Sequence, residues 1–292
     1  MRVSESMLYD AANTSLSGQL TTLQSLTEKI SSAKELNRPS DNPADVRSAV
    51  GLYDTLAQLT QFGRNIDTAT STLSAMDGAL SSAADLIQRA NELAIQGANA
   101  TLDAGDRQSI AAEVSQLTEA MAQDANAQVG NSYIFSGFKT DTPAFQVTGP
   151  GQVGPYQGDN GVVIARVGPS STMQISLSGK TVFQPAIDAL TQLQADLNSG
   201  QPVQGTTITQ ISNALQNLSQ AQATVGAREN RMTDAKTTQQ NLITSNQALL
   251  SDLQDVNMPS AITALTAAQT TYQASLAVTA KVMQTSLIDY LK

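Results

Sequence analysis

The sequence predicts a mainly α-helical protein with a small antiparallel β insertion, in which long helices form discontinuous coiled-coil and rod domains. Three observations lead to this fold class. Apolar residues recur every seven positions over stretches far longer than an ordinary globular helix. Breaks rich in proline and asparagine interrupt these stretches near both ends of the chain. Glycines and aromatic residues gather between residues 133 and 183.

The first helical segment, residues 1–30, carries a narrow apolar stripe. Leu16, Leu23 and Ile30 are seven residues apart, and Leu20 fills one of the intervening steps. A single stripe of this kind more often belongs to the core of a globular domain. A second stripe at the other end of the chain favours a surface that meets other copies.

A proline-rich break follows at residues 36–44 and contains Arg38, Pro39, Asp41 and Pro43. The break predicts a joint between domains, and Pro43 is suited to the first position of a new helix. The seven-residue series then continues without interruption from Leu52 to Ala94. A helix from about residue 43 to about residue 96 is on the order of 80 Å long and requires partner helices.

The remaining elements follow from their local signals. Residues 97–106 contain a helix stop and a new helix start, so a third helix is expected to run back from there. Short β-rich runs at residues 162–167 and 173–177 predict strands. A helix begins at Pro185, and a second long periodic region runs from Ile208 to Val256.

The final segment begins after a break at residues 257–259 and has an interrupted stripe. Gln269, Thr279 and Ser286 occupy positions in it, and polar seam residues can specify register at a cost in stability. The apolar members are Ile262, Leu265, Tyr272, Leu276, Met283 and Leu287. We hypothesise that residues 1–38 and 259–292 have no partner within the monomer and are poorly ordered there, because each stripe alone buries too little surface to offset chain entropy, and that they pair on assembly.

Three domains follow from these breaks. We expect a terminal coiled-coil domain from residues 1–42 and 257–292, and a helical rod from residues 43–138 and 184–256. The β insertion is expected to cover residues 139–183.

Composition excludes several classes of function. The chain has 292 residues, a net charge of -9 and no basic cluster, which argues against nucleic acid as a partner. It has no apolar run long enough to insert into a membrane and no signal peptide for the general secretory route. Cysteine and histidine are absent, so most familiar catalytic and metal-binding arrangements are excluded and no cofactor is expected.

Three local motifs have ordinary structural interpretations. Residues 178–181, Ser-Gly-Lys-Thr, lack the first glycine of a phosphate-binding loop. The acidic pairs near residues 103 and 252 lack the ligand spacing of a calcium loop. Arg228 and Arg231 lie on one side of a helix, where a polar interhelical or intersubunit contact and a simple exposed face are equally good interpretations.

Several segments resemble the flagellin superfamily. They are Asn13-Thr14 with the helix that follows, residues 37–44, residues 225–231 and residues 286–291. The stretch from Asn131 to Phe145, with Phe-Ser-Gly and Thr-Pro-Ala-Phe, resembles specifically the hook-associated protein 3 family of flagellar hook–filament junction proteins. The resemblance covers nearly the whole chain and is weakest at residues 146–181.

The resemblance implies a structural, non-enzymatic protein of the bacterial flagellum with an outer β domain. Members of that family are secreted by the flagellar type III apparatus and form a ring between the first hook-associated junction protein and the flagellin filament. The implied partners are therefore those two proteins, further copies of the chain itself and an export chaperone.

Other functions remain as alternatives. A short flagellin would polymerise into the filament itself. A hydrolase housed in the β insertion would use the region of Asp159, and a coiled-coil adaptor would stay in the cytoplasm. Self-polymerisation, turnover by the insertion and cellular location distinguish the three.

Overall fold

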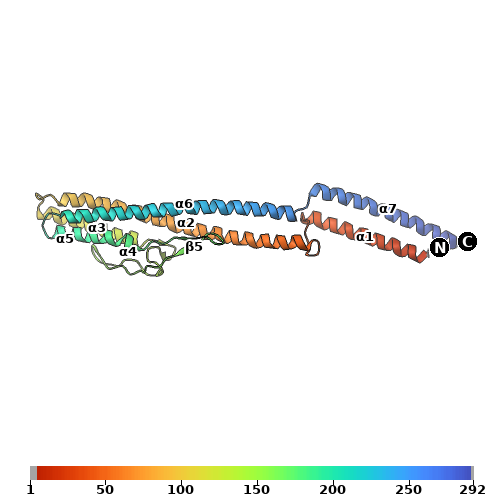
Figure 1. Ribbon diagram of the computed structural model, residues 1–292, viewed down its shortest axis with the longest axis horizontal. Helices are drawn as coiled ribbons and strands as arrows, with labels where there is room; N and C mark the ends of the chain where they lie inside the picture. The colour runs from red at the N-terminus through yellow and green to blue at the C-terminus, as the bar shows by residue number, and fades with distance from the viewer. Residues whose placement is uncertain (1–4, 291–292) are drawn as a thin grey trace. The chain divides into compact units, whose positions relative to one another are not determined.

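The computed structural model describes the backbone of residues 5–290, with the side chains of Met7 and of residues 9–281. Its elements separate into two compact units, one of residues 59–241 and the other of the described residues up to 58 and from 242 onward. The helices are α1 (Glu5–Ser32), α2 (Pro43–Gly97), α3 (Ala104–Ala125), α4 (Gly179–Val182), α5 (Gln184–Asn198), α6 (Gly205–Gln254) and α7 (Met258–Tyr290) (Figure 1).

The two longest helices confirm the periodicity in the sequence. Helix α2 has 55 residues and α6 has 50, and α2 begins at Pro43. Ile66, Leu73, Leu80 and Ile87, which are seven residues apart, are all fully buried. A heptad spacing keeps one face of a helix against its neighbours over many turns, so these helices extend far beyond a globular average.

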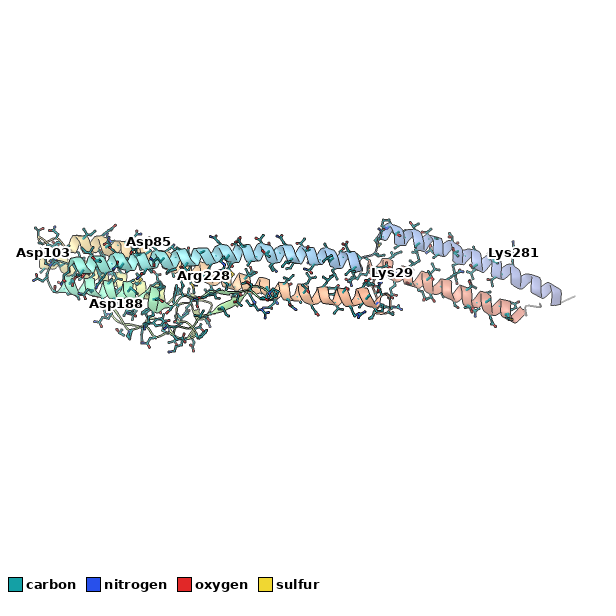
Figure 2. All side chains as sticks on the ribbon, in the orientation of Figure 1. Lys29, Asp85, Asp103, Asp188, Arg228 and Lys281 are labelled. Carbon is teal, nitrogen blue, oxygen red and sulfur yellow. The ribbon has the colours of Figure 1, made fainter. Side chains whose placement is uncertain are left out.

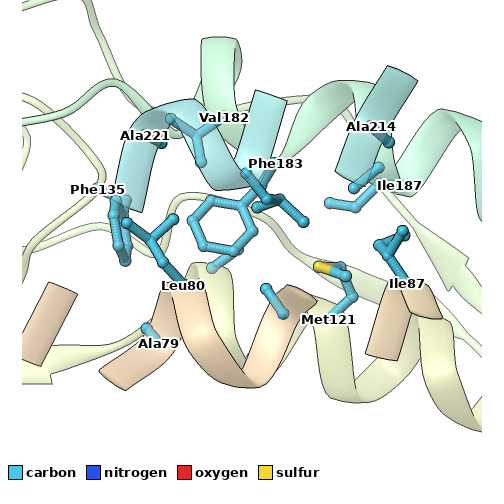
Figure 3. Packing of buried hydrophobic residues seen from close by; sticks show 14 of the residues in the cluster. Ala79, Leu80, Ile87, Met121, Phe135, Val182, Phe183, Ile187, Ala214 and Ala221 are labelled. Carbon is cyan, nitrogen blue, oxygen red and sulfur yellow. The ribbon is translucent and has the colours of Figure 1, made fainter. Parts of the chain in front are cut away.

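Four helices enclose the core of the unit formed by residues 59–241. Helices α2, α3, α5 and α6 contribute most of its buried side chains, and α3 packs closely against α5. Phe135 and Phe183 meet edge to face, with ring centroids 4.8 Å apart, beside Leu80 and Met121 (Figure 3). This aromatic pair ties the two ends of the β-rich segment into the helical core.

A buried arginine closes one end of this core. The guanidinium of Arg107, 3% exposed, donates hydrogen bonds to the carbonyl oxygens of Gly97, Asn99 and Gln201. Gly97 is the last residue of α2, so the cation lies where the helix dipole favours positive charge. The predicted helix start nearby is confirmed, because Asp103 caps α3 by accepting the backbone N–H of Asp106 at 2.7 Å.

The predicted antiparallel β insertion is present, and its strands form three separate two-stranded ribbons. They pair β1 (Gln128–Val129) with β2 (Ser132–Tyr133), β3 (Val147–Gly149) with β4 (Gln152–Val153), and β5 (Ile164–Arg166) with β6 (Thr172–Gln174). The three ribbons do not join into a shared sheet. Two- and three-residue strands supply too few pairs to form a sheet core of their own.

Two of the ribbons are attached to helices by specific side-chain contacts. Gly151, at the tip of the β3–β4 ribbon, has φ 66° and donates its N–H to Glu119 of α3 at 2.9 Å. A Cβ there would lie 2.4 Å from Ser115 Oγ, so only glycine fits. On the β5–β6 ribbon, the Arg166 guanidinium lies 5.7 Å from the ring centroid of Phe62 in α2. The helices therefore position the ribbons.

Two neighbouring phenylalanines test this description of the core. Phe135 is fully buried, whereas Phe138 is 67% exposed. Phe135→Ala should lower the free energy of unfolding by about 3–5 kcal/mol, because it removes a ring from a closely packed core. Phe138→Ala, the matched control, should cost less than about 1 kcal/mol. Chemical denaturation of both variants measures the difference, and equal losses would contradict the packing.

Candidate assembly surfaces

Helix α1 packs against α7 in antiparallel orientation, which corrects the expectation that the end segments have no partner within the chain. Apart from Glu28 and Lys29, the partly buried side chains of α1 from Ala12 to Ile30 are spaced alternately by three and four residues, as are the partly or fully buried side chains of α7. This seam consists of Ala12, Leu16, Gln19, Leu23, Leu26 and Ile30 on α1, and Ala261, Leu265, Ala268, Tyr272, Ser275 and Thr279 on α7.

One layer of this seam is polar and incompletely bonded. The Gln19 side-chain nitrogen donates to Ser275 Oγ at 3.0 Å, while the Gln19 amide oxygen is buried without a hydrogen-bond partner. A buried unsatisfied acceptor costs about 1–3 kcal/mol. Only Leu265 and Tyr272 are large among the α7 seam residues. The pair therefore holds α7 weakly.

The residues predicted for subunit assembly divide between the seam and the exposed face. Leu16, Leu23, Ile30, Leu265 and Tyr272 lie in the seam. The exposed members are Leu20 (45%), Ile262 (50%) and Leu276 (43%), and Met283 and Leu287 lie outside the described side chains.

The division follows from helical phase. Ile262 and Leu276 each follow a seam residue by one position, and one residue turns an α-helix by about 100°. Small residues seven apart at Ala261, Ala268 and Ser275 were the sequence signal for the true seam. Val278, 62% exposed, precedes the seam residue Thr279 by one position, so it lies on the opposite flank of α7, and sequence reasoning missed it.

The outer surface of α7 is also nearly free of charge. Residues 258–280 contain no Asp, Glu, Lys or Arg, and Lys281 is the first charged residue of the helix (Figure 2). The other exposed side chains are mainly Thr, Ala, Gln and Ser. Such a surface loses little when water is removed, since no full charge is desolvated. It is suited to burial against other helices.

Two backbone hydrogen bonds join the segment that follows α1 to the segment that follows α6. The Glu35 N–H donates to the Gln254 carbonyl at 2.7 Å, and the Val256 N–H donates to the Ala33 carbonyl at 3.1 Å. Ala33 has φ 56°, a left-handed conformation that is costly for a residue other than glycine. The backbone therefore turns sharply where α1 ends.

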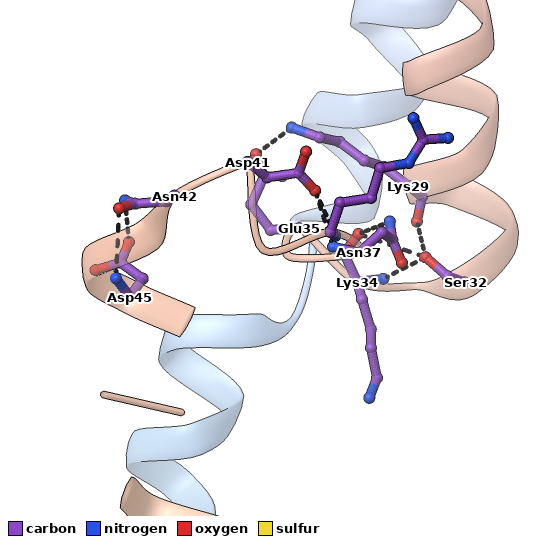
Figure 4. A network of polar contacts seen from close by, with 9 residues as sticks. Lys29, Ser32, Lys34, Glu35, Asn37, Asp41, Asn42 and Asp45 are labelled. Carbon is purple, nitrogen blue, oxygen red and sulfur yellow. Dashed lines mark hydrogen bonds and ion pairs between the residues drawn. The ribbon is translucent and has the colours of Figure 1, made fainter. Parts of the chain in front are cut away.

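Three of the predicted joint residues, Arg38, Pro39 and Asp41, lie in the loop after this turn, where Figure 4 shows Asp41. Asp41 Oδ2 accepts the backbone N–H groups of Asn37 and Arg38, and Arg38 forms an exposed ion pair with Glu28. Hydrogen bonding from the Arg38 N–H holds the pKa of Asp41 below its usual 3.8. Pro39 is exposed, and Pro43 is the first residue of α2.

The start of α2 is capped by a neighbouring side chain. The Asn42 side-chain oxygen accepts the N–H groups of Ala44 at 3.1 Å and Asp45 at 3.3 Å. These bonds satisfy N–H groups that have no partner inside the helix. The break thus ends one helix and begins the next with separate hydrogen bonds, which is the local structure that a joint requires.

The two arginines of α6 take different places. Arg228 donates to the carbonyl oxygen of Ser176, in the loop after β6, at 3.0 Å, and burial lowers the pKa of its guanidinium. Arg231 is exposed. Other residues make polar contacts between α6 and α2, among them Lys236 with Asp67 and Glu229 with Ser74, and sequence reasoning missed these.

Asp159, the candidate for a hydrolytic site, has a structural role in its loop. Its Oδ1 accepts the N–H groups of Phe138 and Gly161, both at 2.8 Å. These bonds, led by the one from Phe138, lower the pKa of its carboxyl group. Within the described residues no cluster of three or more acidic side chains could hold a metal ion. None of the helices described carries the apolar length of a membrane span.

Comparison with known families matches both helical ends of the chain. The bacterial flagellin N-terminal helical region matches residues 3–140, and the flagellin C-terminal helical region matches residues 208–291. Together they account for well over half of the sequence.

The chain belongs to the flagellin family.

Individual relatives within this family are distant. Flagellar hook-associated protein 3 of Salmonella typhimurium is 30% identical over 63% of this chain and 57% of its own length. The 41 kDa flagellar filament core protein of Borreliella burgdorferi is 25% identical over 90% of each chain. The solved flagellar junction protein FlgL of Legionella pneumophila has a TM-score of 0.58 at 17% identity, covering 71% of this chain and 99% of its own.

These similarities are to structural flagellar proteins with long helices, so the mainly helical fold class is confirmed. The chain spans less than two thirds of the length of the hook-associated protein that it matches.

A pH titration tests the bonding of the joint loop. Because the folded pKa of Asp41 is lowered, its carboxylate stabilises the loop fully above about pH 3.8, and this contribution is lost as the pH falls through the lower folded value. Carbon NMR should give an Asp41 midpoint below 3.8, and Asp41→Asn should lose the associated shift changes at Asn37 and Arg38. An Asp41 midpoint at or above 3.8 would contradict the bonding.

Proposed function

We propose that this chain is the hook–filament junction protein of a bacterial flagellum and acts by assembly. Its proposed partners are flagellin, the first hook-associated junction protein and further copies of itself in a ring. An export chaperone would accompany it, and the flagellar type III apparatus would secrete it to the junction. The similarity to hook-associated protein 3 and the resemblance of residues 131–145 support this assignment.

The observation that carries the proposal is the uncharged outer surface of α7, on both sides of its seam. Ile262, Leu276 and Val278 remain exposed after α7 has packed on α1. Residues 258–280 present only polar uncharged and apolar side chains around them. Apolar surface of this kind is stabilised by removal from water, at about 25 cal/mol per Å². A structural subunit obtains that burial from its neighbours.

The weak α1–α7 seam suits the same role. Its polar layer and small α7 residues hold the pair in place with little burial. The residues proposed to form subunit contacts are therefore those of the exposed face together with seam residues that rearrangement would release. Repacking the helices in an assembly then costs little free energy, which is recovered when more apolar surface is covered.

Arg38, Pro39, Asp41 and Pro43 are proposed as the joint between the inner and outer domains. Asn42 caps α2 and Asp41 bonds the loop before it, so α2 can keep its own hydrogen bonds when the direction of the chain changes. The proposed domains are residues 1–42 with 257–292, residues 43–138 with 184–256, and the outer insertion at residues 139–183. Arg228 is proposed to anchor that insertion on the rod.

The proposed role involves no catalysis. Asp159, the strongest candidate acid, uses one carboxylate oxygen to tie backbone N–H groups of its own loop. A carboxylate held ionised by two N–H groups is a poor proton donor near neutral pH. The polar side chains discussed above serve as caps and anchors instead.

A filament flagellin is the competing assignment, because the Borreliella filament protein matches 90% of the chain. The two functions differ in what the purified protein does. A flagellin extends into long filaments alone, whereas a junction subunit stops at a ring or requires the hook as a template. Electron microscopy of concentrated protein distinguishes them.

Deletion of the gene tests the proposed function directly. Cells without the chain should build hooks but release flagellin into the medium, because the filament would have no junction on which to grow. Immunoblots of culture medium and electron microscopy of hooks measure both effects. Normal filaments in the deletion strain would overturn the proposal.

Substitutions at the exposed face test the assembly surface. Ile262→Asp places a charge on a surface that must lose water, so the chain recovered in sheared flagella should fall about tenfold or more. Ile95→Asp makes the same change at an isoleucine that is 59% exposed on α2, and it is the matched control. Both variants should melt within a few degrees of the parent protein. Equal incorporation of the two would exclude this face as a contact.

A further inference from the structure

Residues 46–57 of α2 and 242–253 of α6 form a two-helix section. The two sides of this section that flank the contact between the helices, here called its edges, carry different residues. Its seam consists of Val46, Ala49, Leu52 and Leu56 on α2, and Ile243, Asn246, Leu250 and Leu253 on α6. Four large apolar side chains lie outside this seam and are exposed. They are Val50 (54%), Tyr53 (45%), Leu242 (46%) and Leu249 (54%).

A hydrogen bond shows which of these residues share an edge. Tyr53 Oη donates to the Gln254 side-chain oxygen at 2.7 Å, and each of these residues follows a seam residue by one position. Residues one position after the seam therefore lie on one edge, whichever helix they come from. Val50 also follows the seam by one, so it joins Tyr53 on this edge, here called the Val50 edge.

Leu242 and Leu249 lie on the opposite edge. Each of them precedes a seam residue, Ile243 or Leu250, by one position, so each is turned the other way by about 100°. We call this the Leu249 edge. A single copy cannot cover both edges with its own side chains, since the section contains only these two helices.

The charged residues follow the same division. The section contains three of them, namely Arg47, Asp54 and Asp252. Arg47 follows Val46 and lies on the Val50 edge, while Asp252 precedes Leu253 and lies on the Leu249 edge. Asp54 is two positions beyond the seam residue Leu52, on the outer face of α2. One edge thus carries a cation and the other an anion.

The two edges also match in height along the section. Helical side chains lean toward the N-terminus of their own helix, by about one turn for long residues. The Tyr53–Gln254 bond therefore places about residue 50 of α2 beside about residue 250 of α6. In an antiparallel pair, Val50 is then level with Leu249, Arg47 with Asp252, and Ala57 with Leu242.

We propose that copies of this chain pack side by side, with the Val50 edge of one copy against the Leu249 edge of the next. In this contact Arg47 meets Asp252, Val50 meets Leu249, and Leu242 packs over Ala57. Contact between equal edges at the same height would bring like charges together instead. Two different faces that meet repeatedly generate a ring or a helical array rather than a closed dimer. This proposal rests on the proposed role as an assembling subunit.

Cysteine cross-linking tests the contact, because the chain has no cysteine of its own. The variant Val50→Cys/Leu249→Cys replaces the native chain in its source bacterium, and sheared flagella are oxidised with copper phenanthroline. Non-reducing gels should show dimers and a ladder of higher multimers. Val50→Cys/Ala248→Cys is the matched control, since Ala248 lies on the outer face of α6, and it should give no ladder.

The outcomes separate this contact from the proposed function. If the chain is present in the flagella but the Val50/Leu249 pair gives no ladder, the edge contact is overturned and the junction role stands. Dimers formed by Val50→Cys alone would show that equal edges meet, which also overturns it. If the chain is absent from flagella of the parent strain, both proposals are overturned.

Charge reversal gives an independent test of direction. Arg47→Asp and Asp252→Arg should each lower the amount of chain in sheared flagella about fivefold, because each turns an attraction into a repulsion. The double variant restores an opposite pair across the same contact and should return to within about twofold of the parent. Additive losses, about twenty-fivefold in the double variant, would exclude the pairing. Thermal melting confirms that each soluble variant is folded.

Discussion

The structure depends on one constraint, which is that an α-helix presents a single narrow stripe when its apolar residues are spaced by three and four. Where four helices meet, the stripes of α2, α3, α5 and α6 converge and bury one another completely. Where only two helices run together, as in α1 with α7, one seam is buried and the remaining apolar residues face outward. The number of neighbouring helices therefore decides which parts of the chain can bury their apolar residues within one molecule.

Polar side chains mark the breaks between helices. Asp41, Asn42 and Asp103 supply side-chain oxygens at breaks, and Arg107 supplies a cation to carbonyl groups at the end of α2. Asn42, Asp103 and Arg107 act on backbone groups that a helix end leaves without partners, whereas Asp41 accepts N–H groups of the loop itself. Polar groups inside a seam have another effect. Gln19 leaves an oxygen unsatisfied, and that weakens a contact without ending a helix.

The long helices and their breaks were predictable because heptad spacing, proline and asparagine act locally. The exact seam of α7 was not, because Ile262 and Ala261 are adjacent and their burial depends on which side α1 occupies. The larger residue was expected inside, but the smaller one is buried. The three separate ribbons were also unpredictable, since Gly151 binds Glu119, which is distant in sequence. For the same reason, the sequence left a polar contact and an exposed face equally good interpretations for Arg228, and it could not identify Ser176 as its partner.

The pairing of α1 with α7 has a consequence for the order of folding. Gln19 and Ser275, which form its polar layer, are 256 positions apart in the chain. Contacts of such high sequence separation form late, because a long loop must close before they yield any stabilisation. A polypeptide that emerges from its N-terminus can form the α3–α5 packing well before α7 arrives. The α1–α7 pair can therefore form only after the residues of α7 have been synthesised. A chain interrupted before α7 cannot form it.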